Sequence, residues 1–190
     1  MSDLHADATA TLAAWRPDHH GQESLRQALL AFLAAREDAC LRACVPGHVT
    51  ASAVVVDHAG DQVLLTLHPR VGRWLQLGGH CEPSDTTLVG AALREATEES
   101  GIPGLVIEPT PLHVDVHPVT CSLGVPTRHL DVRFLVRAPA GARPVRSEES
   151  VDLRWWRIED APGATAHGEL REMLTAARHR LPASAPARTN

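Results

Sequence analysis

Residues Gly78 to Ile102 read GGHCEPSDTTLVGAALREATEESGI, and the rest of the chain is best understood from this stretch. Its second half predicts one helix, which Ser84 or Asp85 begins as N-cap and Gly101 ends. Apolar residues recur along that helix at a spacing that gives it one packing face: Leu88, Ala91, Ala92 and Ala96. The stretch therefore predicts a glycine-containing loop followed by an amphipathic helix.

Three carboxylates crowd the end of this helix. Glu95, Glu98 and Glu99 are spaced i, i+3 and i+4, so they share one face and repel one another. The C-terminal end of a helix dipole also disfavours anions. Arg94 can pair with Glu98 but cannot neutralise all three charges. This arrangement indicates a bound hard cation with oxygen ligands, Mg²⁺ or Mn²⁺.

The same stretch resembles the Nudix box, whose pattern is G-x5-E-x7-REUxEExGU with U an aliphatic residue. Residues 94–102 read REATEESGI and match the second half of the pattern, and Gly78-Gly79 stand in the place of its leading glycine. Asp85 replaces the leading Glu, and eight residues rather than seven separate it from Arg94. We interpret this difference as one inserted residue at the helix start together with a conservative substitution.

The resemblance implies an α/β fold, a Nudix-type α/β/α sandwich with a mixed β-sheet. It also implies metal-dependent hydrolysis of a nucleoside diphosphate linked to another group X, by water attack on phosphorus. The implied metal ligands are Glu95 and Glu99, completed by Glu98 and the carbonyl of Gly79. The implied catalytic residues are the glutamates Glu95 and Glu98, an acid outside the box such as Glu149, and Arg94, which would orient the glutamates.

Composition excludes several other functions. The 190 residues include no lysine, so a P-loop lysine, a Schiff-base lysine and a Ser-Lys dyad are impossible. A net charge of −5, 3% aromatic residues and no tyrosine argue against nucleic-acid binding, including a decapping role. No apolar run is long enough for a membrane span, and no signal peptide precedes the first helix, so we expect a cytoplasmic protein. The four cysteines form no CxxC pair, and we expect them to be reduced thiols.

The chain divides into three parts by its patterns. Residues 1–46 predict an N-terminal helical extension, which is either packed on the main domain or used as an arm for a homodimer. Residues 47–181 predict the Nudix domain, with strands at 49–57, 63–67 and 151–158 and a closing helix at 168–181. Residues 182–190 predict a disordered tail.

Two short segments alternate ionisable and apolar residues. His113 to His117 and His129 to Phe134 each predict a strand with one charged and one apolar face, paired as a hairpin. The charged face is either exposed to water, a substrate cleft or a second metal site. We expect a small-molecule nucleoside diphosphate derivative to bind there. The residues expected to bind it are Arg73, His80, His117, His129 and Asp131.

Two other functions remain open from the sequence. A binding or sensor module could keep the fold without catalysis, although such a module would usually have lost the box glutamates. An isoprenyl diphosphate isomerase would need its own Cys and Glu signatures; Cys81 lies in the right vicinity, but the motif around it is absent. The resemblance also implies an acidic residue just before the last strand that reaches the metal ligands from outside the box. Glu149 or Glu148 is the candidate, and the alternative is an ordinary acidic loop.

Overall fold

The computed structural model describes residues 2–70, 72–120, 124–148, 150–162 and 169–181. The helices are α1 (Asp3–Ala14), α2 (His20–Ala35), α3 (Leu88–Ser100) and α4 (Glu169–Arg180), with a 3-10 helix at Ile158–Asp160. The strands are β1 (His48–Val56), β2 (Gln62–Leu67), β3 (Trp74–Leu75), β4 (Leu77–His80), β5 (Val106–Ile107), β6 (His113–Thr120), β7 (Pro126–Arg137) and β8 (Asp152–Arg157). The strands predicted at 49–57, 63–67 and 151–158 are present within one residue at each end, and the two predicted hairpin strands, β6 and β7, are each longer than predicted.

The eight described strands form one mixed sheet around β1. Strand β1 runs parallel to β7 along its whole length, with His48 opposite His129 and Val56 opposite Arg137. Its other edge is shared, because β4 pairs with the first half of β1 and β2 pairs with the second half. Strand β7 is likewise shared between β6 and β5. Every residue of β1 is buried, as expected of a central strand covered on both faces.

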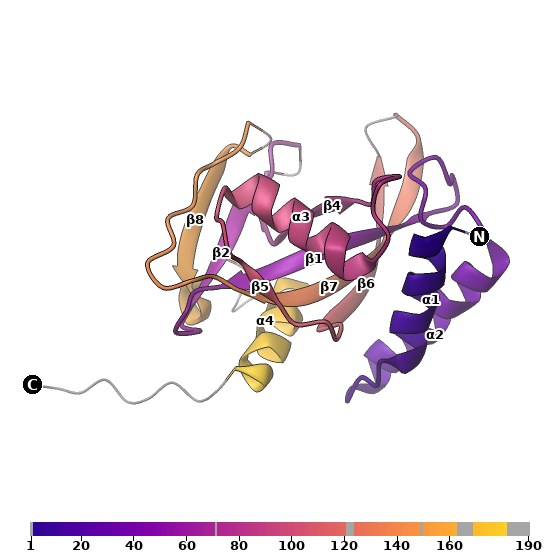
Figure 1. Ribbon diagram of the computed structural model, residues 1–190, viewed down its shortest axis with the longest axis horizontal. Helices are drawn as coiled ribbons and strands as arrows, with labels where there is room; N and C mark the ends of the chain where they lie inside the picture. Colours follow the sequence, from indigo (N-terminus) through magenta and orange to yellow (C-terminus); the bar gives the residue numbers. More distant parts are fainter. Residues whose placement is uncertain (1, 71, 121–123, 149, 163–168, 182–190) are drawn as a thin grey trace, which may run out of the picture.

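Helices cover both faces of the sheet, as Figure 1 shows. Helix α3 lies across one face, where Ala96 packs with Ala53 and Val55 of β1. Helix α4 lies against the other face, where Met173 packs with Val54 and Val56. Alternate residues of β1 therefore face opposite helical layers. The α/β/α sandwich with a mixed sheet is confirmed.

The N-terminal extension is confirmed as a pair of helices, and both pack on the domain (Figure 1). Leu12, Leu29 and Leu33 are fully buried in a cluster shared with α3 and the sheet, and each such burial contributes about 1.5–3 kcal/mol to stability. Two polar contacts fix the docking. A carboxylate oxygen of Asp7 accepts a hydrogen bond from the backbone N–H of Leu88 at 2.8 Å, at the first turn of α3. Gln22 exchanges hydrogen bonds with both backbone groups of Val114 on β6.

The start of α3 differs from the prediction. Thr87, and not Ser84 or Asp85, is the N-cap, and its hydroxyl accepts a hydrogen bond from the N–H of Gly90 at 3.0 Å. Asp85 is unavailable as a cap because its carboxylate binds a loop N–H and Arg94. Since the helix begins only at Leu88, the inserted residue is absorbed in the preceding loop.

Three cysteines lie in the described part of the chain, and all three are free and buried. Cys121 and the predicted tail at 182–190 lie outside the described residues. Among the described helices, none combines the length and the apolar character that crossing a lipid bilayer requires.

Candidate active site

Helix α3 presents its carboxylates to the glycines of β4. A Cβ atom on Gly79 would lie 2.8 Å from the carboxylate carbon and both carboxylate oxygens of Glu95, which is closer than real Cβ atoms approach. Only glycine leaves this space open. The carboxylate of Glu95 therefore packs directly on the backbone of Gly79.

The preceding glycine is required for a different reason. Gly78 has φ +143°, and a Cβ there would lie 2.5 Å from the Cα of Ser52 on β1. Its N–H donates a 3.0 Å hydrogen bond to the carboxylate of Glu99. The two glycines thus allow two glutamates, one helical turn apart, to reach the same strand.

Arg94 holds the glutamate cluster from the side. Its Nη1 atom donates to Glu95 at 3.1 Å and to Glu98 at 3.0 Å, and its Nη2 atom donates to the carbonyl of His80 at 3.1 Å. Its remaining donors bind both carboxylate oxygens of Asp85, at 2.9 and 3.2 Å. Burial raises the pKa of Asp85, but the hydrogen bond and charge of Arg94 outweigh burial and lower it below its usual value.

The shorter side chain of Asp85 therefore still reaches the arginine despite the inserted residue. Hydrogen bonds to three carboxylates, those of Asp85, Glu95 and Glu98, fix the guanidinium group of Arg94 in one orientation. In that orientation Arg94 donates hydrogen bonds to both Glu95 and Glu98. The departure from the Nudix pattern at Asp85 is absorbed in the loop and leaves these contacts intact.

The three box glutamates differ in exposure. The side chain of Glu95 is 13% exposed, whereas that of Glu98 is 60% exposed. Carboxylate oxygens beside an open glycine backbone suit the oxygen-rich coordination of Mg²⁺ or Mn²⁺. The cradle that a Cβ would fill at Gly79 lies where a backbone carbonyl can approach such an ion. The residues present therefore fit a hard divalent cation.

A strip of polar side chains crosses the sheet on the face that carries α4. We define this polar strip as the alternating residues that the strand register aligns on β1, β4, β6 and β7: His48, Thr50, Ser52, His80, His113, Asp115, His117, His129, Asp131 and Arg133. The predicted hairpin is confirmed, with His117 opposite His129 and Asp115 opposite Asp131. On the charged face of the hairpin, His113, Asp131 and Arg133 are buried, and the other three side chains are half-buried.

One half of the polar strip is an ion pair between Asp131 and Arg133 with its hydrogen-bond partners. Asp131 accepts hydrogen bonds from Arg133 at 2.7 Å, Ser52 at 2.7 Å and Thr50 at 2.9 Å, and from Gln76 at 3.2 Å. The side chain of Arg133 is completely buried. Burial raises the pKa of Asp131, but the nearby charge of Arg133 and these hydrogen bonds lower it below its usual value. This half of the strip is a satisfied internal network.

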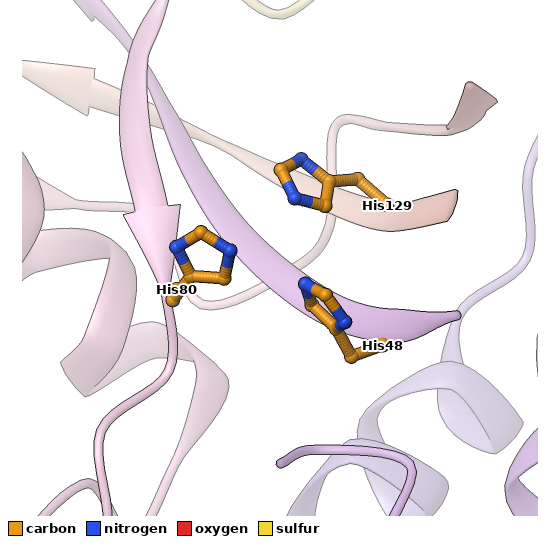
Figure 2. Close-up of side chains that lie close together, drawn as sticks. All are labelled: His48, His80 and His129. Atoms are coloured by element: carbon orange, nitrogen blue, oxygen red, sulfur yellow. The ribbon is translucent and has the colours of Figure 1, made fainter. Parts of the chain in front are cut away.

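Histidines fill the other half of the polar strip. The rings of His48, His80 and His129 approach one another with centroids 5.0–5.1 Å apart, and Figure 2 shows them converging from β1, β4 and β7. His117 stands beside His129 at 5.5 Å. Burial, followed by neighbouring positive charge, lowers the pKa of His80 to about 3 and the pKa of His129 to about 4. These imidazoles are neutral at physiological pH.

The structure brings some of the predicted site residues together and not others. Arg94, Glu95, Glu98 and Glu99 gather around Gly79. The predicted substrate residues His80, His117, His129 and Asp131 all lie in the polar strip. Arg73 is exposed in the loop before β3, and no side-chain contact among the described residues joins it to either group. Glu149 lies outside the described residues.

Two residues of this region were missed from the sequence. His48 belongs to the histidine group, and Gln76 reaches Asp131 from the short segment between β3 and β4. A signal for His48 was present, because His48, Thr50 and Ser52 alternate with apolar residues at the start of the first strand. Gln76 gave no comparable signal.

The buried thiol of Cys81 argues against the isomerase alternative. Cys81 packs in the apolar cluster between the N-terminal helices and α3, and it is 7% exposed. Burial raises its pKa well above the usual value for a thiol. An inert, protonated thiol of this kind is a packing residue.

Comparisons with known proteins agree with this fold. A family profile described as the NUDIX domain matches residues 46–176, which is more than half of the chain. No curated protein sequence matches the chain. Solved structures do, and the similarity extends over most of each molecule.

Three of these structures illustrate the range of sequence identity and coverage. The Ap4A hydrolase of C. elegans has 23% identity and a TM-score of 0.54, over 69% of this chain and 95% of that chain. The E. coli dihydroneopterin triphosphate pyrophosphohydrolase has 20% identity and a TM-score of 0.52, over 70% of this chain and 94% of that chain. A UDP-X diphosphatase has 15% identity and a TM-score of 0.51, over 92% of this chain and 90% of that chain. At these identities the likeness shows a shared fold, and together with the domain match it establishes that the chain belongs to the Nudix family, as a pyrophosphohydrolase.

Proposed function

We propose that the protein hydrolyses a phosphoanhydride bond in a nucleoside diphosphate linked to another group X, with Mg²⁺ or Mn²⁺ as cofactor and water as nucleophile. The single observation that supports this proposal best is the seat of Glu95 on the backbone of Gly79. Any side chain at position 79 would occupy that space. A helix with three crowded carboxylates needs a counter-cation, and a phosphate chain supplies the remaining oxygen ligands of such an ion.

The proposed ligands are Glu95 and Glu99, completed by Glu98 and the carbonyl of Gly79. When bound, the ion would neutralise phosphate charge and lower the pKa of the attacking water. Arg94 would keep the carboxylates oriented through its contacts with two of them. The general base is Glu95, Glu98 or Glu149.

The proposed substrate residues act in different ways. His80, His117 and His129 line the histidine half of the polar strip, and Arg73 would attract an anionic phosphate chain from its exposed loop. Asp131 is buried behind Gln76, whose amide nitrogen it binds at 3.2 Å. We therefore assign Asp131 a positioning role, through Gln76, rather than direct substrate contact.

The substrate we propose is a small nucleoside diphosphate derivative. The structural relatives support this class, because their names specify Ap4A, dihydroneopterin triphosphate and UDP-X as the compounds on which they act. We expect no nucleic-acid partner and a cytoplasmic location, and a homodimer remains an expectation from the sequence. The sensor alternative is disfavoured by the intact glutamates and their support by Arg94 and the glycines.

The test is nucleotide or phosphate release from a panel of nucleotide sugars, dinucleoside polyphosphates and nucleoside triphosphates, with Mg²⁺ or Mn²⁺. Wild type is compared with Glu99→Gln and with Glu37→Gln, a matched change outside the site. We expect metal-dependent hydrolysis in wild type and Glu37→Gln, and loss of it in Glu99→Gln. Tight binding of a panel member without hydrolysis would replace this proposal with a sensor function.

A further inference from the structure

We propose that His48, His80 and His129 form a second metal site, for a nitrogen-binding ion of the zinc class, separate from the carboxylates of α3. Each residue offers one ring nitrogen, and the three nitrogens lie within 4.8 Å of one another. Figure 2 shows the three rings directed toward a common point. This inference goes beyond the proposed hydrolysis: it uses none of the box glutamates, and it gives His80 and His129, proposed above as substrate residues, the role of metal ligands.

Orphaned nitrogen atoms are the second observation behind the site. The Nε2 atoms of His48 and His129 are buried and have no hydrogen-bond partner in the described structure. A buried polar atom without a partner costs free energy. Two such atoms in one cluster are satisfied together when both present a lone pair to one cation.

The contact on the other side of His48 selects the required tautomer. Its Nδ1 atom lies 3.4 Å from the carbonyl oxygen of Cys44, which can only accept a hydrogen bond. The proton is therefore on Nδ1, and Nε2 presents its lone pair to the cluster. Metal-binding histidines typically donate their second ring N–H to a carbonyl or carboxylate in this way.

His117 lies beside this group of three histidines. Its Nδ1 atom is 2.7 Å from a carboxylate oxygen of Asp115, and its ring is 5.5 Å from that of His129. This is the carboxylate–histidine pairing that supports a metal ligand. Its side chain is 35% exposed, whereas His48 is almost fully buried, so His117 stands on the solvent side of the cluster.

The chemistry of the donors selects the ion. Neutral imidazoles suit Zn²⁺, Co²⁺, Ni²⁺ or Cu²⁺, while Mg²⁺ prefers oxygen ligands. Nitrogens on one tetrahedral zinc are about 3.3 Å apart, given Zn–N bonds of about 2.0–2.1 Å. The present spacing of up to 4.8 Å must therefore shorten when the three rings close on the ion. Burial lowers the pKa of both His48 and His129, which keeps both rings neutral.

Strand β4 lies between the carboxylate cluster of α3 and the histidine cluster, and contributes a residue to each. Gly79 lies against Glu95, and its neighbour His80 points to the other side of the sheet, toward β1 and β7. Successive residues of a strand face opposite sides. The two sites are therefore adjacent along the chain but have different donors and different faces.

The first experiment measures zinc binding to the tag-free, chelator-treated protein by equilibrium dialysis, with Co²⁺ absorption as a report of tetrahedral coordination. His48→Gln and His129→Gln are compared with His58→Gln, a matched change at an exposed histidine on another surface. We expect one zinc per chain in wild type and His58→Gln, and at least tenfold weaker binding in the two cluster variants. Equal binding in all four proteins would overturn the site.

A second measurement needs no variant, in case a cluster variant fails to fold. X-ray absorption of the zinc-loaded wild type reports the atoms around the ion. We expect a nitrogen shell at about 2.0 Å with the outer scattering of imidazole rings. An oxygen-only shell would assign the zinc to the carboxylates and refute the histidine site. Glu99→Gln is expected to bind zinc as wild type does.

Discussion

The carboxylate cluster on α3 and the histidine cluster on the polar strip share strand β4 but are assembled in opposite ways. Glu95, Glu98 and Glu99 come from one helix, and the partner strand brings the backbone of Gly78 and Gly79 to them. The three histidines come from three strands and meet only because β1 pairs with both β4 and β7. A local motif builds the first cluster, whereas sheet register builds the second.

The two clusters also differ in charge. The carboxylates carry charges that one arginine only partly neutralises, with Glu98 mostly exposed. The histidines carry no charge at neutral pH because burial lowers their pKa values. Charged oxygen donors suit a hard ion that also binds phosphate, and neutral nitrogen donors suit a borderline ion held in place.

The largest effect is expected from Glu95→Gln. The amide keeps the shape and one acceptor oxygen, so the fold is retained, but it removes the charge seated on Gly79. We expect kcat of the metal-dependent reaction to fall by about a thousandfold or more. Steady-state kinetics and a melting curve measure both parts, and near-normal turnover would remove Glu95 from the proposed ligands.

Asp131→Asn tests whether the ion-pair half of the polar strip is structural. Breaking a buried ion pair costs about 3–5 kcal/mol, and Asp115 at 3.5 Å from Arg133 places the expected loss at the lower end. A loss of about 3 kcal/mol lowers the melting temperature by about 6–12 °C. Unchanged stability with a raised KM would instead assign Asp131 to substrate contact.

The same pair predicts a pH dependence of stability. Because the pKa of Asp131 is lowered in the folded protein, its contribution is present above the ordinary aspartate pKa and is lost as pH falls through the folded pKa. Acid unfolding of wild type should therefore begin below about pH 4 at this site. Asp131→Asn should show less of this dependence, as measured by denaturant midpoints from pH 3 to pH 7.

Zinc should stabilise the fold through the histidines. At about 100 times its dissociation constant, a ligand adds about 2.7 kcal/mol, which raises the melting temperature by about 5–10 °C. We expect this rise in wild type and in Glu99→Gln and its loss in His129→Gln. Thermal melts with and without zinc provide the check. A rise in melting temperature that is lost in Glu99→Gln and kept in His129→Gln would show that zinc binds the carboxylates of α3 and not the histidines.

Asp7→Ala tests the docking of the N-terminal extension. Removing an acceptor from the first turn of a helix costs about 1 kcal/mol, so the melting temperature should fall by about 2–4 °C. The catalytic rate should change little, since Thr87 still caps α3. A large loss of rate would show that the extension positions the carboxylates.

The sequence was sufficient for the features that depend on local patterns. Alternation predicted β6 and β7 as a hairpin, and helical spacing predicted α3 and its shared carboxylate face. It failed at the N-cap, because the competing contact of Asp85 with Arg94 spans nine residues. His48 could not be assigned to a site, because its neighbours His80 and His129 are 32 and 81 residues away and only strand register unites them.

The measurement that tests the central claim most directly is Mn²⁺ binding followed by electron paramagnetic resonance, in wild type, Glu99→Gln and His129→Gln. Free Mn²⁺ gives a six-line spectrum whose intensity falls as the ion binds. If the carboxylates of α3 hold the hard ion, Glu99→Gln loses Mn²⁺ binding while His129→Gln binds as wild type does. Mn²⁺ binding that survives in Glu99→Gln and disappears in His129→Gln would contradict the account.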